Sequence, residues 1–191
     1  MADLPFGDDV VVSVTEAREL CGDPSRSLRH RVALVGASVA DAVGSAGGWM
    51  FDQAMAGWDT YVVAYDLNGA RSLRILGARC IDLREALAEA DGGPWPDSLV
   101  ISADLYRLDG KVREAVGETL KNGRTTVTVW GPDCPLDLAA HARTSLYRIS
   151  SAAAAFKPRA LAAAGIAPIG DASVEPFHTP SLATANLSKR N

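Results

Sequence analysis

Short apolar runs alternate with amphipathic segments over most of the chain. Runs rich in β-branched, aliphatic and aromatic residues predict strands over 60–65, 79–81, 99–102 and 125–130. Between them, apolar residues recur at helical intervals, and glycines such as Gly77 close the helical segments. Strands that alternate with helices in this way indicate a parallel sheet with helices on both faces.

Residues 28–48 fit two interpretations. A continuous apolar run over 32–35 is typical of a buried strand. The same region also carries a longer stripe at intervals of three and four residues, which predicts an amphipathic helix. The stripe consists of Leu28, Val32, Val35, Val39, Ala42, Ala46 and Trp49. We favour a helical arm that leads to Trp49, although Gly36 and Gly44 would each cost it about 1 kcal/mol relative to alanine.

The segments on either side of this alternation also carry helix signals. Ser13-x-x-Glu16 fits a capping box that opens a helix through Leu20. Towards the other end, Pro135 opens a predicted Ala-rich helix that continues through Ile149. The predicted fold class is therefore α/β, a Rossmann-like three-layer sandwich with a helical N-terminal arm. Its mostly parallel sheet would have four to five strands, with helices on both faces.

One domain accounts for most of the sequence. We expect a flexible N-terminus over 1–9, a single Rossmann-like domain over 10–169, and a flexible tail over 170–191. The tail is rich in Ser, Thr, Pro and Asn without any period, which is typical of a segment that cannot bury a core.

Composition limits the functional classes. The 191 residues, 48% of them hydrophobic and 22% charged, are enough for one substantial core. No apolar run approaches the length of about 18 to 20 residues that spans a membrane. The acidic first residues carry no secretion signal, so we expect a cytoplasmic protein. A formal net charge of -4 gives no general attraction to nucleic acid, and the abundance of Arg and Ala is typical of a bacterial source.

Sequence signatures of common cofactor sites are missing. Neither G-x-G-x-x-G nor G-x-x-x-x-G-K-[ST] follows the run over 32–35, so a nucleotide-binding protein would lack a standard phosphate loop. The three cysteines and three histidines are scattered, which argues against a disulfide framework and a zinc site. We therefore expect no cofactor.

Aspartates follow several of the predicted strands. In an open parallel sheet, ligands bind where the strands end at their carboxyl edge. Asp66, Asp82, Asp104 and Asp133 lie at or just after such ends. Carboxylates gathered there could hold Mg²⁺ and align a water for phosphodiester hydrolysis. Aspartate is equally typical of turns and helix N-caps, so this alternative stays open.

Three segments carry a resemblance to a known family. They are Gly77 to Leu83, Ser98 to Asp104 and Lys121 to Pro132. Together, over about 77–149, they resemble the second half of an NYN domain of the PIN-like nuclease superfamily. The resemblance implies a Rossmann-like sheet and a Mg²⁺-dependent acidic site, with Asp82 and Asp104 on two of the acidic positions. The sequence departs from the family pattern where 32–35 is followed by Gly36 instead of an aspartate, and a site so incomplete would hold metal poorly.

Aromatic residues around 49–58 suggest a different role. Trp49, Phe51 and Trp58 could form a surface for a protein partner or for self-association, or they could belong to the core. Because no complete catalytic motif is present, the favoured hypothesis is a non-catalytic Rossmann-like module that binds proteins and no membrane. The alternative is a degenerate PIN-like ribonuclease using Asp66, Asp82 and Asp104 with Mg²⁺, and a nucleotide-binding protein is more distant.

Overall fold

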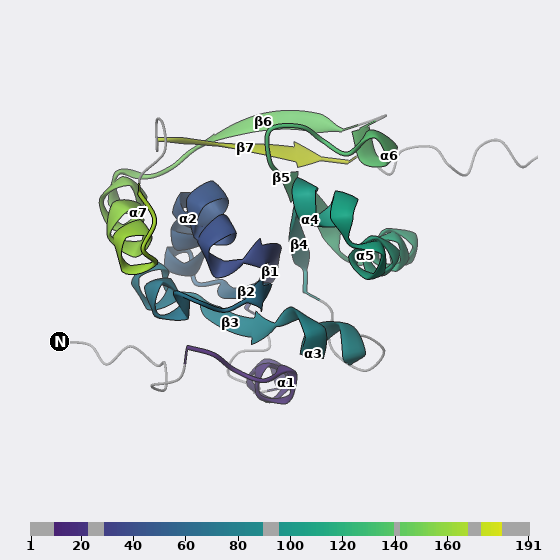
Figure 1. Ribbon diagram of the computed structural model, residues 1–191, viewed down its shortest axis with the longest axis horizontal. Coiled ribbons are helices and arrows are strands. Elements are labelled where there is room, and N and C mark those ends of the chain that lie inside the picture. Colours follow the sequence, from purple (N-terminus) through teal and green to yellow (C-terminus); the bar gives the residue numbers. More distant parts are fainter. Residues whose placement is uncertain (1–9, 23–28, 90–95, 140–141, 168–172, 181–191) are drawn as a thin grey trace, which may run out of the picture.

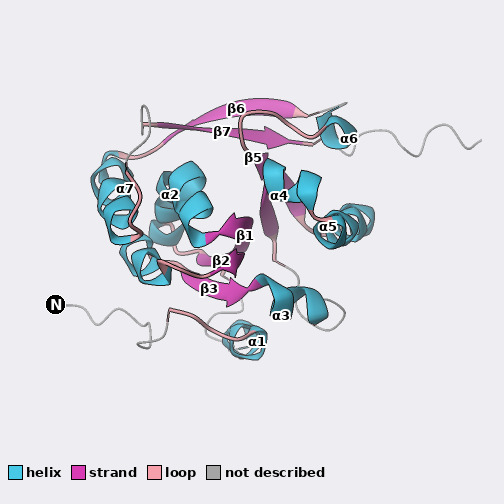
Figure 2. Ribbon diagram, in the orientation of Figure 1, coloured by secondary structure: helices cyan, strands magenta, loops and turns pink. Residues whose placement is uncertain are grey.

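The computed structural model describes residues 10–22, 29–89, 96–139, 142–167 and 173–180. Within them, seven strands form one sheet in the order β3-β2-β1-β4-β5-β7-β6 (Figures 1 and 2). The strands are β1 Arg31–Ser38, β2 Asp59–Asp66, β3 Arg79–Asp82, β4 Ser98–Ser102, β5 Thr126–Trp130, β6 Arg143–Arg148 and β7 Val174–Thr179. The helices are α1 Val14–Gly22, α2 Val39–Met55, the 3-10 helix η1 Ala70–Leu76, α3 Leu83–Ala88, α4 Ala103–Leu108, α5 Gly110–Asn122, α6 Leu136–Ala139 and α7 Ser151–Ala163. None of these helices is long and apolar enough to cross a bilayer.

The sheet is mixed. Strands β1 to β5 are parallel to one another, whereas β7 is antiparallel to both β5 and β6. The predicted α/β class is therefore confirmed in its coarse form. The finer prediction, a Rossmann-like sandwich with four to five strands, is too simple, because an antiparallel pair extends one edge of the sheet.

Alternate side chains of the central strands enter different halves of the core. Val32 and Leu34 of β1 pack with α2, η1 and α7, whereas Val35 packs with α1, α3, α4 and α5. Figure 1 shows these two groups of helices on opposite sides of the sheet. Since both faces are covered, the central strands are nearly continuous apolar runs, which is why the sequence predicted most of them.

The helical interpretation of residues 28–48 is wrong. Residues 31–38 form β1 in the middle of the sheet, and α2 begins directly after them. Ser38 ends the strand and caps the helix, because its Oγ accepts the N–H of Asp41 at 3.0 Å. The strand β1 is buried on both faces, and the amphipathic helix α2 follows it directly. The apolar residues of these two elements happen to lie at helical intervals, which is why the sequence pattern suggested one long helix.

A glycine inside α2 allows that helix to pack closely. A Cβ added at Gly48 would lie 2.5 Å from Cγ2 of Ile149 and 3.0 Å from Oε1 of Glu175. Glycine lowers the intrinsic stability of a helix relative to alanine. At this position, however, any larger side chain would collide with Ile149 and Glu175.

Two predictions for the C-terminal third are wrong. The helix expected from Pro135 through Ile149 is a short α6 followed by the strand β6, and residues 140–141 lie outside the described residues. The tail expected over 170–191 contains β7, which pairs with both β5 and β6. The expectation of a flexible segment over 1–9 lies outside the described residues.

Candidate functional site

The structure gives three of the four predicted carboxylates a local partner. Asp66 accepts the N–H of Asn68 at 2.9 Å. Asp82 caps α3 and lies 3.3 Å from an Arg84 guanidinium nitrogen. Asp104 is exposed on α4 and forms an ion pair with Arg107. The fourth candidate, Asp133, is also exposed.

These carboxylates are not gathered into a metal-binding group. Among the described residues, no group of three or more His, Cys, Asp or Glu side chains could hold a metal ion. The contacts of Asp66 and Asp82 are those of turn and cap residues, the alternative that the sequence left open. Catalytic or metal-binding roles for Asp66, Asp82 and Asp104 stay predictions.

The predicted partner surface consists of rings that each pack on another ring. Phe51 is buried and stacks on Phe156, with ring centroids 5.0 Å apart. Trp49 packs against Phe177, and Trp58 is half-buried against the imidazole of His30. All three rings contribute to packing within the chain, and a role in binding a partner stays a prediction.

A pocket lies between α2 and α7, and we call it the polar pocket because Asp41, Ser45 and Lys157 line it together with apolar residues. Its volume is about 480 Å³, within the usual range of ligand sites. The pocket contains Asp41 and Ser45 from α2 and Lys157 from α7. None of these residues was singled out from the sequence. The one signal that could have found Asp41 is the N-cap pattern Ser38-x-x-Asp41, which marks the carboxyl end of β1, a typical ligand position in α/β sheets.

Asp41 is placed in this pocket by the first turn of α2. The Oγ of Ser45, one turn further along, donates to Oδ1 of Asp41 at 3.3 Å. A Cβ added at Gly36 would lie 3.4 Å from Oδ2 of Asp41 and 3.1 Å from Cζ2 of Trp130. The missing side chain at Gly36 therefore allows the carboxylate and the indole to approach the end of β1. The N-terminal end of a helix also favours a negative charge.

Lys157 lies on the opposite wall of the same pocket, and its side chain is almost completely buried. Its Nζ lies 2.7 Å from Oε1 of Glu175, and the two side chains are 5% and 1% exposed. Oε1 and Oε2 of Glu175 also accept the N–H groups of Gly48 and Trp49, each at 2.8 Å. Charged hydrogen bonds of this kind fix the position of the ammonium group.

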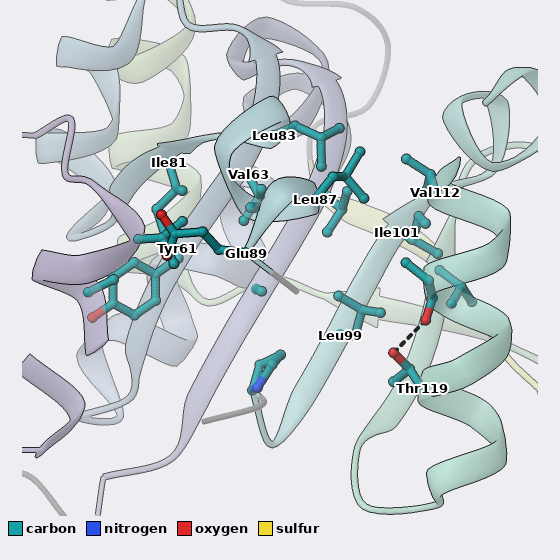
Figure 3. A pocket seen from close by; sticks show the side chains of 18 of the residues that line it. Tyr61, Val63, Ile81, Leu83, Leu87, Glu89, Leu99, Ile101, Val112 and Thr119 are labelled. Carbon is teal, nitrogen blue, oxygen red and sulfur yellow. Dashed lines mark hydrogen bonds between the residues drawn. The ribbon is translucent and has the colours of Figure 1, made fainter. Parts of the chain in front are cut away.

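A second cavity lies on the other face of the sheet. Figure 3 shows it between α3 and α5, with strands of the sheet as its floor. Its volume is about 230 Å³, and α1 also contributes to its wall. The lining is almost entirely aliphatic, represented by Val63, Leu87, Leu99, Ile101 and Val112. The two hollows are therefore chemically different.

Comparisons with known proteins found similarity in structure only. No family model matches the sequence, and no curated protein matches it significantly. A deacetylase of the A40926 pseudoaglycone superposes with a TM-score of 0.55 at 14% identity, over 80% of this chain and 97% of the deacetylase. A teicoplanin-pathway deacetylase in complex with teicoplanin gives 0.54 at 13%, over 78% and 97%. The chain shares the fold of these deacetylases. A conserved protein of Thermus thermophilus also gives 0.54 at 13%, over 84% and 99%.

These similarities correct two expectations from the sequence. The resemblance to PIN-like nucleases over 77–149 is wrong, because the matched structures have a deacetylase fold and give no support to a nuclease. The segments that suggested it are strands and helix ends common to βαβ units in general. The hypotheses of a non-catalytic binding module and of a degenerate ribonuclease are contradicted by the same structures, several of which are deacetylases.

Proposed function

We propose that this protein is a hydrolase that removes an acyl group from the nitrogen of a polar, sugar-like substrate in the pocket between α2 and α7. The observation that carries the proposal is the position of Asp41, a carboxylate at the carboxyl end of β1 that lines a pocket in a chain with a deacetylase fold. Ligands bind at this edge of open α/β sheets. The reaction class follows from the deacetylases that share the fold, one of which acts on the A40926 pseudoaglycone and another of which forms a complex with teicoplanin.

The residues of the pocket have distinct parts in this chemistry. Asp41 would act as the general base, taking a proton from water while the water oxygen attacks the acyl carbonyl carbon. The C–N bond then breaks, and the proton returns from Asp41 to the leaving amine. Ser45 orients the carboxylate of Asp41 through its hydrogen bond. Because the ammonium group of Lys157 is already paired with Glu175, the part that Lys157 has is to form the opposite wall of the pocket.

The test is hydrolysis of N-acetylated sugars. Purified protein is incubated with N-acetylglucosamine and with N,N′-diacetylchitobiose, and both acetate and the new free amine are measured. We expect release of both products by the natural chain and a loss of about a hundredfold or more in Asp41→Asn, since positioned bases contribute about 10²- to 10⁴-fold. Asp66→Asn, at an exposed turn, is the matched control and should be as active as the natural chain.

The same assay is repeated with added zinc and with EDTA, which shows whether a metal ion contributes. Absence of acetate release under every condition would overturn the proposal. Activity that persists in Asp41→Asn would remove this pocket as the catalytic site.

A further inference from the structure

We propose that the cavity between the sheet and helices α1, α3 and α5 binds a straight alkyl chain that carries a neutral head group. This site lies on the face of the sheet opposite α2 and α7. It is therefore separate from the pocket that contains Asp41, and the inference does not depend on the proposed hydrolase activity.

The cavity is large enough for a small apolar ligand. Its volume is about 230 Å³, and an apolar cavity of roughly 150 Å³ already holds benzene. Branched aliphatic side chains of β1, β2 and β4 line the cavity on the side of the sheet, and Val116 lines it from α5. Figure 3 shows Leu83 and Leu87 on one side of the cavity and Val112 on the other. Burial of apolar surface would be the main source of affinity.

The shape favours a linear ligand. On α5 the lining extends from Val112 to Thr119, which is two turns of helix or about 10 Å at 1.5 Å per residue. Across the sheet, the floor extends from Ile81 in β3 to Leu99 and Ile101 in β4. The floor therefore crosses four neighbouring strands, three spacings of about 4.8 Å each. An extended chain can follow the whole of this width, whereas a compact ring system would fill only part of it.

The polar side chains of the lining determine the charge of the ligand. Arg18 donates from Nη1 to Oε2 of Glu89 at 2.9 Å and from Nη2 to the carbonyl oxygen of the same residue. Nε of Arg31 lies 3.5 Å from Oδ2 of Asp97. The hydroxyl of Thr119 donates to the carbonyl oxygen of Ala115 at 2.8 Å (Figure 3). Because both guanidinium groups already have a carboxylate beside them, an added anion would meet no excess positive charge, and a neutral head fits better.

The binding experiment uses a series of unbranched alcohols from 1-butanol to 1-nonanol, measured by isothermal titration calorimetry. Affinity should rise about fourfold for each added methylene, which corresponds to about 0.8 kcal/mol per buried CH₂. It should stop rising once the chain reaches the end of the cavity. Cyclohexanol should bind more weakly than 1-hexanol, and octanoate more weakly than 1-octanol.

Two alanines of α3 provide a matched pair of variants. Ala86 lines the cavity, whereas Ala88 is exposed and does not line it. Ala86→Leu places an isobutyl group in the cavity and should weaken 1-octanol binding by about tenfold or more, while Ala88→Leu should bind like the natural chain. If Ala86→Leu does not fold, Ala115→Leu fills the cavity from α5 instead.

Saturable binding with a chain-length limit that the cavity-filling variant shortens would support the proposal. Absence of saturable binding, or equal binding by Ala86→Leu and the natural chain, would overturn it. Tighter binding of cyclohexanol than of 1-hexanol would overturn the linear shape of the ligand. Tighter binding of octanoate than of 1-octanol would overturn the neutral head group.

Discussion

Nζ of Lys157 lies 2.7 Å from Oε1 of Glu175, and the two side chains are among the most deeply buried charged groups in the described part of the chain. The pair connects α7 with β7, and the same carboxylate binds two N–H groups in the middle of α2. Glu175 thus connects three elements: β7, which contains it, α7 through Lys157, and α2 through the N–H groups of Gly48 and Trp49.

Glu175→Gln should destabilise the protein strongly. The substitution leaves the ammonium of Lys157 buried without a counter-charge, and breaking such a pair typically costs about 3–5 kcal/mol. Urea denaturation followed by circular dichroism measures the loss. Glu118→Gln, which breaks the exposed pair with Lys121, should change the free energy of unfolding by less than about 1 kcal/mol.

The double variant Lys157→Met/Glu175→Gln should recover part of this loss, because no unpaired charge then remains in the core. A double variant that is no more stable than Glu175→Gln alone would show that the backbone contacts of Glu175 in α2, and not the charge of Lys157, dominate the effect.

Two glycines of α2 should respond to alanine in opposite directions. Gly48→Ala should lower the free energy of unfolding by about 1–3 kcal/mol, because its Cβ would lie 2.5 Å from Cγ2 of Ile149. Gly44→Ala meets no atom within 4 Å and should raise stability by up to about 1 kcal/mol through helix propensity. Equal effects of the two substitutions, measured by thermal and urea unfolding, would contradict the close packing at Gly48.

Hydrogen bonding between Tyr65 and Asp109 should make stability depend on pH at both extremes. Tyr65 Oη donates to Oδ2 of Asp109 at 2.6 Å, which raises the pKa of Tyr65 to about 12 and lowers the pKa of Asp109. The contribution of Tyr65 is complete below its unfolded pKa of about 10 and is lost as pH rises through about 12. The contribution of Asp109 is complete above its unfolded pKa and is lost as pH falls through the lower folded value.

Tyr65→Phe tests this coupling. The variant should be about 0.5–1.5 kcal/mol less stable at neutral pH, the usual net value of one hydrogen bond. Its deficit relative to the natural chain should shrink in strong alkali and in strong acid. A deficit independent of pH would mean that packing of the ring, and not its hydroxyl, accounts for the difference.

The thiol of Cys80 should be unreactive in the folded protein. The side chain is fully buried in β3, and burial raises its pKa to about 12, so thiolate is scarce at neutral pH. In a Cys21→Ser/Cys134→Ser background, the remaining thiol should react with Ellman's reagent only after denaturation. A Cys21→Ser/Cys80→Ala background keeps the half-buried Cys134 and should react measurably before denaturation.

Local signals in the sequence predicted much of the parallel core. The capping box of α1 is confirmed, because Ser13 Oγ accepts the N–H of Glu16 and the Glu16 carboxylate accepts the N–H of Ser13. Gly77 and Gly123 end their helical segments with positive φ angles, as expected of helix C-caps. Such features depend on residues only a few positions apart.

The antiparallel edge and the polar pocket could not be predicted in the same way. Most side chains of β6 are exposed, so the strand lacks the apolar alternation that marks a half-buried strand. In β7 the buried residues include Glu175 and His178, whose partners lie far away in the sequence. Asp41 and Lys157 line one pocket although 116 positions separate them, and no spacing rule connects such residues.

Glu175 also has a consequence for the order in which the protein matures on the ribosome. The N–H groups of Gly48 and Trp49 precede their carboxylate acceptor by 127 and 126 positions. A nascent chain that has not yet reached residue 175 therefore lacks both this acceptor and the counter-ion of Lys157. The unit of β1 and α2 is synthesised early, but it gains these contacts only after β7 has been synthesised. A chain truncated before β7 would lack the hydrogen bonds from Gly48 and Trp49 to Glu175.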